Sequence, residues 1–246
     1  MELRDCFAEK PRAALAFSGG VDSVYLLYEA LRSGAAVQPY FVKTPFQPNF
    51  ELTDAERVCR EWNVELTVLE LELPKAVLEN PNNRCYLCKH ALFERLWEQA
   101  RADGFSLLLD GTNASDDPTD RPGMRALGEL SVQSPLRLCG LTKAEIRRRS
   151  KEAGLWTWDK PAYACLATRF PAGTSITEEM LRHVETAEAL LLSLGFSDFR
   201  VRVFEGAARI QVPQTQMERL LFHRGEICSV LAPRFRGVFL DLEGRP

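Results

Sequence analysis

AALAFSGGVDS, at residues 13–23, is the stretch that decides the fold of this chain. Residues 13–17 form a short apolar run that ends at a glycine pair, a pattern typical of a buried strand. Residues 22–33 follow with apolar side chains at helical spacing, which predicts a helix. A buried strand that enters a helix through a glycine-rich turn is the opening unit of an α/β fold with a parallel sheet.

Strand-like and helix-like runs continue to alternate through the first two thirds of the chain. Further strands are expected at residues 37–42, 66–71, 106–109 and 131–136, and helices at residues 52–62, 89–103 and 142–153. This alternation predicts a parallel five-stranded sheet with helices on both of its faces.

The pattern changes after Pro161, where proline and glycine residues punctuate a connecting segment. Beyond it we expect a helix, two strands, a helix and a strand, at residues 177–194, 199–204, 207–212, 213–224 and 237–242. These elements predict a small α+β domain. We therefore divide the chain into a first domain at residues 1–165 and a small C-terminal domain at residues 166–246.

Composition excludes several classes of function. The 246 residues are 46% hydrophobic, enough for a core, and carry a formal net charge of −3. A protein that coats nucleic acid would instead have a basic excess. No apolar run reaches the roughly 18 residues that a membrane span needs, and residues 1–12 lack the apolar segment of a signal peptide. We therefore expect a cytoplasmic protein with neither a membrane nor a nucleic-acid partner.

The glycine-rich turn SGGVDS has the properties of a phosphate-binding loop. Gly19 and Gly20 let the backbone approach a phosphate, and the N–H groups of the first helical turn point towards it. Ser18 and Ser23 add hydroxyl donors. An aspartate at this position would repel phosphates unless Mg²⁺ lay between them, so we assign Asp22 to a bound Mg²⁺. The alternative is an ordinary turn in which Asp22 caps the helix.

A second polar cluster, DGTN at residues 110–113, follows the predicted strand at residues 106–109. Ligands of open parallel sheets collect at the carboxyl ends of the strands, so we expect this cluster on the same rim as the phosphate loop. The alternative is a hydrogen-bonded turn, which this sequence forms readily. Asp116 and Asp117 lie just beyond, and Arg121 could add a cation to the site.

The seven cysteines do not form the even set of a disulfide framework. Four are expected to be small buried hydrophobic residues: Cys6, Cys59, Cys139 and Cys228. Cys85 and Cys88 form a CxxC pair at the start of a predicted helix, and Cys165 lies far along the chain. A CxxC pair can bind zinc, hold an iron–sulfur cluster or act as a redox pair. The histidines offer no evident fourth zinc ligand, so three thiols fit an iron–sulfur cluster with an open iron. A buried CxxC pair with an unrelated Cys165 is the alternative.

Several motifs occur together in a fixed order. They are SGGVDS at 18–23, NP at 80–81, RCYLCK at 84–89, DGTN at 110–113, RPG at 121–123, SPL at 134–136, KAEIR at 143–147 and WDKP at 158–161. This set resembles the LarE-type sulfur transferases, a branch of the PP-loop ATP pyrophosphatases, and the resemblance covers about residues 13–212. It implies the adenine nucleotide alpha hydrolase-like fold of that superfamily.

The resemblance also implies a reaction and its cofactors. An ATP- and Mg²⁺-dependent enzyme of this type adenylylates a carboxylate of pyridinium-3,5-biscarboxylic acid mononucleotide and converts it to a thiocarboxylate, in the biosynthesis of the nickel-pincer nucleotide of lactate racemase. The substrate is a small nucleotide, and the family forms homo-oligomers. A tRNA-thiolating or other PP-loop enzyme with an iron–sulfur cluster is the alternative. The acidic net charge and the lack of a recognisable RNA-binding sheet disfavour it.

By the same resemblance, individual residues acquire roles. ATP would be bound by Ser18, Gly19, Gly20, Val21, Asp22, Ser23, Asp110, Gly111, Thr112 and Asn113. The thiols of Cys85, Cys88 and Cys165 would hold a 4Fe-4S cluster whose open iron carries sulfide, and together with Asp22 they are the expected catalytic residues. Another branch of the family gives up the sulfur of a single cysteine that matches Cys165. The substrate phosphate or an inter-subunit site would be lined by Thr168, Arg169, Glu188, Arg200 and Arg202. Two arginines at alternate strand positions could clamp a phosphate, and a solvated strand face is the alternative.

Overall fold

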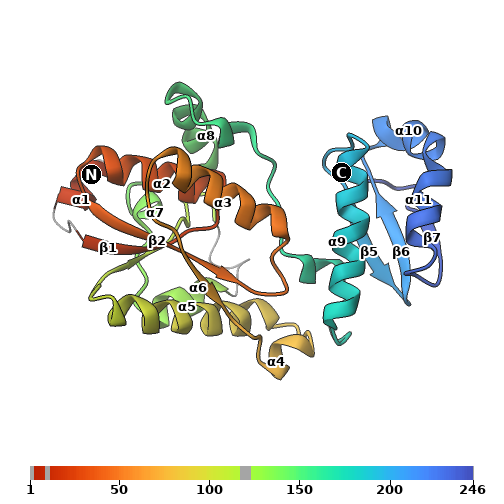
Figure 1. The fold of residues 1–246 in the computed structure, drawn as a ribbon, viewed down its shortest axis with the longest axis horizontal. Coiled ribbons are helices and arrows are strands. Elements are labelled where there is room, and N and C mark those ends of the chain that lie inside the picture. Colours follow the sequence, from red (N-terminus) through yellow and green to blue (C-terminus); the bar gives the residue numbers. More distant parts are fainter. Residues whose placement is uncertain (1–2, 9–11, 117–122, 246) are drawn as a thin grey trace. The chain divides into compact units, whose positions relative to one another are not determined.

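The computed structural model describes residues 3–8, 12–116 and 123–245 (Figure 1). The predictions on Asp117 and Arg121 lie outside these described residues. Contacts divide the chain into unit 1, Met1–Val77 with Asn83–Ala162, and unit 2, Leu78–Asn82 with Tyr163–Pro246.

A short segment from the middle of the first unit's sequence belongs to unit 2. Its anchor is Asn80, which is fully buried at a φ of 54°. The Asn80 side-chain amide donates to the Pro171 carbonyl at 2.7 Å, and the Asn80 carbonyl accepts from the Gly173 N–H at 2.7 Å. The NP motif therefore joins residues 78–82 to residues 171–173 of unit 2.

Unit 1 is built on a parallel sheet in the order β3-β2-β1-β4. Its strands are β1 (Arg12–Ala16), β2 (Ala36–Lys43), β3 (Thr67–Glu70) and β4 (Leu108–Leu109). All three strand pairings are parallel. Parallel neighbours need crossover connections, and helices supply them here. This confirms the α/β class that the sequence predicts.

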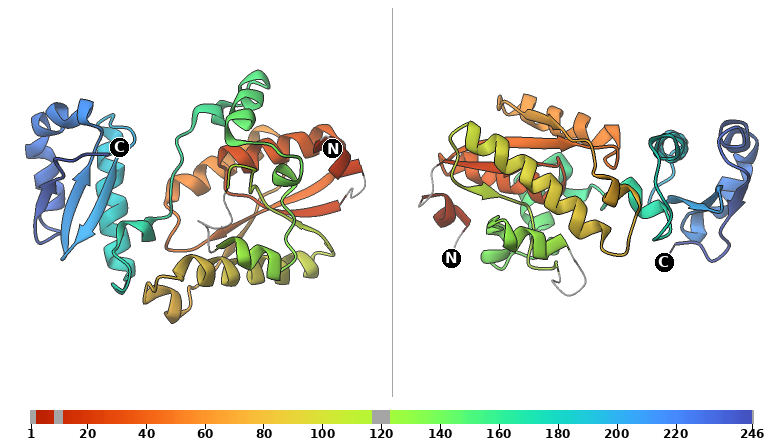
Figure 2. Two further views of the ribbon diagram at one scale, coloured as in Figure 1. Left: turned by 180° about the vertical axis from the view of Figure 1, so that it is seen from behind. Right: turned by 90° about the horizontal axis from the view of Figure 1, so that it is seen from below.

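Helices cover both faces of this sheet (Figures 1 and 2). Because side chains alternate along a strand, Ala13 and Leu15 of β1 enter one core while Ala14 enters the other. The first core packs against α2 (Val21–Arg32) and α3 (Asn49–Glu61), and the second packs against α5 (Arg84–Ala102). The small residues of β1 let both helical layers approach the centre of the sheet.

The remaining helical segments of unit 1 are short, and most of them follow β4, the last strand of the sheet. They are α1 (Leu3–Ala8), α4 (Lys75–Leu78), α6 (Gly123–Glu129), α7 (Pro135–Leu138), α8 (Lys143–Glu152) and η1 (Trp156–Asp159). Across the described ranges of both units, helices long and apolar enough for a membrane span are absent.

The predicted fifth strand at residues 131–136 does not form as a strand. In the described part of the chain the sheet has four strands, and beyond β4 only Gln133 makes an isolated parallel bridge, to Leu109. Ser131 adopts a φ of 53°, which interrupts extended backbone. Pro135 then starts helix α7, a position for which the fixed proline φ is suited. Strand pairing by residues 131–136 is therefore limited to Gln133.

Unit 2 is a small α+β unit with a three-stranded sheet in the order β5-β6-β7. Strands β5 (Arg200–Phe204) and β6 (Ala207–Gln211) are antiparallel, and β7 (Val238–Leu240) runs parallel to β6. Its helical segments are α9 (Glu178–Ser193), α10 (Met217–Phe222), α11 (Arg224–Leu231), η2 (Leu166–Arg169) and η3 (Gln214–Gln216). The predicted helix at 213–224 is thus split, and α11 lies beyond the predicted end.

Candidate functional site

The predicted phosphate loop connects β1 to α2. Gly19 has a φ of +66°, and a Cβ there would lie 2.8 Å from the Ala55 backbone nitrogen of α3, so only glycine fits. The hydroxyl oxygens of Ser18 and Ser23 lie 3.2 Å apart, and Ser23 Oγ donates to the Gly20 carbonyl at 3.2 Å. The helix begins at Val21, so the orphan N–H groups of its first turn open on this loop.

Asp22 lies inside the first turn of α2, after Gly20 at the N-cap position. Its Oδ2 accepts from Lys143 Nζ at 2.6 Å, and Lys143 is the first residue of α8. Its Oδ1 is buried and has no hydrogen-bond partner among the described residues. A buried carboxylate oxygen without a partner is costly unless a ligand satisfies it. Asp22 Oδ1 therefore fits the hard oxygen ligand that Mg²⁺ prefers.

A second lysine, Lys160, reaches the same loop from the end of η1. Its Nζ donates to the Gly19 carbonyl at 3.3 Å and pairs with Asp54 Oδ2 at 2.5 Å. Two ammonium groups therefore contact the loop, at Asp22 and at Gly19, and each is paired with a carboxylate. This arrangement can hold polyanionic phosphates through backbone N–H groups and through two cations.

The DGTN turn lies against the same helix start. A Cβ on Gly111 would come within 3.1 Å of the Ser23 backbone nitrogen, so this glycine permits the close approach. Asp110 is buried, and its carboxylate accepts from Ser134 Oγ at 2.5 Å and from the Thr112 hydroxyl. Asp110 thus shapes the rim of the loop, with both of its oxygens engaged internally.

The rest of the DGTN turn is held by its own side chains. Asn113 Oδ1 accepts from the Ser115 N–H at 2.8 Å, and Asp116 Oδ2 accepts from the Asn113 N–H at 3.0 Å. This is the hydrogen-bonded turn that the sequence offered as an alternative. The DGTN segment therefore forms this turn and also lies beside the phosphate loop. It does both because the Gly111 backbone, rather than the Asp110 carboxylate, lies close to the loop.

Cys85 and Cys88 lie in the first turns of α5, three residues apart on one face. Cys85 is exposed and Cys88 is partly buried. Arg84 Nη2 lies 3.7 Å from Cys85 Sγ. Tyr86, between the two cysteines, donates its hydroxyl to Glu129 Oε2 of α6 at 2.7 Å. The helix start that carries the thiols is therefore braced by α6.

Cys165 belongs to unit 2, where it is the N-cap residue of η2. Its carbonyl accepts from Thr168 Oγ1 at 2.9 Å and from Arg169 Nη1 at 3.2 Å. Within the described ranges, no group of three or more His, Cys, Asp or Glu side chains is assembled that could hold a metal ion. The CxxC pair and Cys165 come from different units, and the three-cysteine cluster stays a prediction.

Arg169 and Glu188 form a buried ion pair behind Cys165. Arg169 Nε and Nη2 donate to the two Glu188 oxygens at 2.9 and 2.8 Å, and the side chains are 0% and 4% exposed. Arg169 Nη1 also donates to the Ala164 carbonyl at 2.7 Å. Tyr163 donates its hydroxyl to Glu188, and burial raises the pKa of this phenol, so it remains a donor. The pair therefore fixes the backbone on either side of Cys165.

Arg200 and Arg202 alternate along β5, as predicted, and are partly exposed. Arg202 Nε donates to Gln211 Oε1 at 2.7 Å and its Nη1 to the Thr168 carbonyl at 3.0 Å. Burial, and then the positive charge of Arg169, lowers the pKa of both guanidinium groups. Arg209 of β6 is directly opposite Arg202, which adds a further cation to this sheet face. Positive charge crowded in this way favours an anionic ligand.

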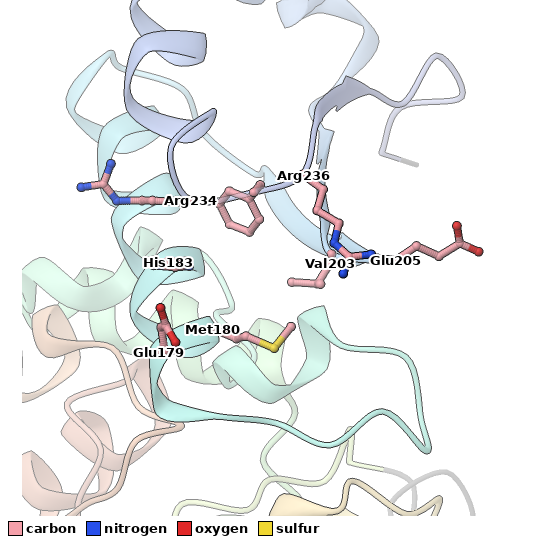
Figure 3. Close-up of a pocket in the computed structure, with 9 residues that line it drawn as sticks. Glu179, Met180, His183, Val203, Glu205, Arg234 and Arg236 are labelled. Carbon is pink, nitrogen blue, oxygen red and sulfur yellow. The ribbon is translucent and has the colours of Figure 1, made fainter.

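Another part of unit 2 has an open pocket of about 700 Å³ between α9 and the turn of the β5–β6 hairpin (Figure 3). It is lined by Glu179, Met180, His183, Val203, Glu205, Gly206, Arg234, Phe235 and Arg236. None of the predicted site residues lies among these nine.

Comparison with known proteins identifies the family. An uncharacterized protein of Synechocystis sp. is 37% identical over 254 residues, which cover 98% of this chain and 92% of that protein. The pyridinium-3,5-bisthiocarboxylic acid mononucleotide synthase of Lactiplantibacillus plantarum is 32% identical over 238 residues, which cover 95% of this chain and 86% of that protein. The chain belongs to the LarE family of sulfur transferases. An uncharacterized protein of Methanocaldococcus jannaschii is 30% identical over 242 residues, with 98% and 93% coverage. No model of a protein family matches the chain.

Membership of the LarE family confirms the resemblance that the motifs indicate, and the iron–sulfur subtype stays a prediction. In this LarE-family chain the structure adds Lys143, Lys160 and Asp54 to the phosphate loop. Both lysines lie in motifs, KAEIR and WDKP, so the sequence carried a signal for them. Their partners lie 121 and 141 residues away, at Asp22 and Gly19, and only the fold brings them together.

Proposed function

We propose that this chain uses ATP to adenylylate a carboxylate of pyridinium-3,5-biscarboxylic acid mononucleotide and then converts it to a thiocarboxylate. The observation that carries the proposal is the phosphate loop, where the buried Asp22 Oδ1 has no partner among the described residues and two lysine ammonium groups are in contact with the loop. The relative from Lactiplantibacillus plantarum is named as a synthase of the bisthiocarboxylic acid mononucleotide, and this name supports a thiocarboxylate product of the same class.

The chemistry requires two displacements. A carboxylate oxygen is a poor leaving group, so it first attacks the α-phosphate of ATP and expels pyrophosphate. Sulfur then attacks the carbonyl carbon of the adenylylated substrate and expels AMP, which keeps the former carboxylate oxygen. The chain's own contribution to the first step is to bind and orient the triphosphate, through the N–H groups of the first turn of α2 and through Lys143.

Mg²⁺ fits the residues at this loop, because Asp22 Oδ1 is a buried oxygen that lacks a partner in the described structure. When bound, Mg²⁺ would offset the negative charge of the departing pyrophosphate. Asp22 would hold it, and Lys143 would then be released from Asp22 towards the phosphates.

A 4Fe-4S cluster fits the chemistry of a thiol set, here Cys85, Cys88 and Cys165, because thiolates are the ligands such clusters take. When bound, such a cluster would supply the sulfur for the transfer. The two cysteines of α5 lie where the helix dipole favours thiolates, and Arg84 adds a positive charge beside Cys85. The Arg169–Glu188 pair would position Cys165 through its backbone.

We further propose that the phosphate of the mononucleotide binds to Arg200 and Arg202, and that the protein works as a homo-oligomer. Burial first, and then repulsion from Arg169, lowers the pKa of both guanidinium groups, and an anion at this face would relieve that repulsion.

The test is an anaerobic incubation of the purified chain with ATP, Mg²⁺ and the biscarboxylate mononucleotide, followed by mass spectrometry of nucleotides and product. We expect AMP, pyrophosphate and a product in which sulfur replaces a carboxylate oxygen, and no product with Asp22→Asn. Pyrophosphate release that does not depend on the mononucleotide would refute the proposal. Thiolation of tRNA in a parallel incubation would favour the RNA-modifying alternative instead.

A further inference from the structure

The ammonium group of Lys160 is held at the phosphate loop by a carboxylate from a different helix. Its Nζ lies 2.5 Å from Asp54 Oδ2 of α3 and 3.3 Å from the carbonyl oxygen of Gly19, a residue of the loop itself. The side chains of Lys160 and Asp54 are 16% and 25% exposed, so the pair is accessible from solvent.

The backbone that carries Lys160 is fixed independently of this ion pair. Arg147 of α8 donates from Nη1 to the Trp158 carbonyl at 2.7 Å and from Nη2 to the Lys160 carbonyl at 2.6 Å. The Lys160 N–H also donates to the Thr157 carbonyl at 3.1 Å. A planar guanidinium that bonds two carbonyl groups of one segment holds that segment in one geometry. The lysine side chain can therefore change partner while its backbone stays in place.

Helix α8 thus positions both lysines that contact the loop. Its first residue, Lys143, pairs with Asp22, and one turn later Arg147 holds the segment of Lys160. A triphosphate carries more negative charge than a single carboxylate, so it can compete with Asp54 for the lysine. Once the phosphates arrive, the Asp54 carboxylate would be a repulsive neighbour.

We propose that Lys160 is a phosphate ligand for ATP, and that Asp54 masks it in the nucleotide-free protein. The proposal rests on the ATP-dependent function proposed above and adds a partner exchange to it. It predicts opposite effects of the two halves of one ion pair. Loss of the Lys160 charge weakens ATP binding, whereas loss of the Asp54 charge strengthens it, because the competing carboxylate is gone.

The alternative is a structural brace between the loop and α3. A brace fails when either partner is removed, so both substitutions would then weaken ATP binding and lower the melting temperature together. The two roles are therefore distinguished by the sign of the Asp54 effect rather than by the size of the Lys160 effect.

The experiment measures binding of the α,β-methylene analogue of ATP, with Mg²⁺, to the full chain by calorimetry, beside melting temperatures. We expect Lys160→Met to raise Kd about tenfold, equivalent to about 1.4 kcal/mol. Asp54→Asn should lower Kd, and the double variant should match Lys160→Met alone. Lys151→Met is the matched control, since Lys151 is exposed on α8 and its Nζ lies over the Trp158 ring at 4.4 Å.

A rise of Kd in Asp54→Asn, or a Kd of Lys160→Met equal to that of Lys151→Met, would overturn the partner exchange while leaving the proposed function intact. Absence of binding by the unmodified chain would overturn both. If Lys160→Met fails to fold, Lys160→Gln replaces it. The Asp54→Asn measurement still shows whether loss of the Asp54 charge lowers or raises the Kd.

Discussion

Replacement of Glu188 by glutamine should destabilise unit 2 strongly, because it leaves the Arg169 charge buried. The Glu188 carboxylate accepts two bonds from Arg169, at 2.9 and 2.8 Å, one from the Val201 N–H at 2.9 Å and one from the Tyr163 hydroxyl. Glutamine keeps the size but loses the charge, and its amide nitrogen would face a donor. Removal of one partner from a buried pair costs about 3–5 kcal/mol.

The expected readout is the melting temperature of the full chain by calorimetry. At about 2–4 °C per kcal/mol for a chain of this size, the expected fall is roughly 6–20 °C. The matched control is Glu152→Gln, which breaks a solvent-exposed pair with Arg148, 60% and 55% exposed, and should lower the melting temperature far less. A fall no larger than that of the control would refute the structural role of the Arg169–Glu188 pair.

Three further outcomes follow from the same structure. Asp22→Asn should abolish Mg²⁺-dependent release of AMP and pyrophosphate with an unchanged melting temperature; near-normal release would mean that Asp22 holds no metal. Arg200→Ala and Arg202→Ala should raise the KM for the mononucleotide more than they lower kcat, the signature of lost uniform binding, and an unchanged KM would indicate a solvated strand face. Burial raises the pKa of the Cys59 thiol to about 11, so in the folded, cluster-free protein Cys59 should resist iodoacetamide near neutral pH while the exposed Cys85 reacts. Equal labelling rates in the native state would contradict this.

Local patterns predicted those parts of the fold whose determinants are local. The apolar run and glycine pair at residues 13–20 suffice for β1 and the loop, because a buried strand and a Gly-rich turn need few distant contacts. The same reasoning was wrong for residues 131–136, which do not form the predicted strand. Their composition suits a strand, but the φ of Ser131 and the proline at the start of α7 leave only Gln133 to pair.

The site shows a similar division. Motifs are enough to select Asp22 and the DGTN turn as site residues. Their proximity could be predicted because the ends of parallel strands lie on one rim of the sheet. The partners of Lys160 could not be predicted, because Asp54 and Gly19 reach it only through tertiary packing. The family resemblance places Arg169 and Glu188 at the substrate phosphate or at an inter-subunit site, which stays a prediction. In the structure they also bond to each other, which sequence spacing alone does not indicate.

Heavy-oxygen labelling shows whether ATP activates the substrate carboxylate. The biscarboxylate mononucleotide, with its carboxylate oxygens isotopically labelled, is incubated anaerobically with the chain, ATP and Mg²⁺, and the AMP is analysed by mass spectrometry. Because sulfur attacks carbon and expels AMP, we expect the AMP to carry one labelled oxygen atom. AMP without the label, formed at the same rate as product, would contradict it.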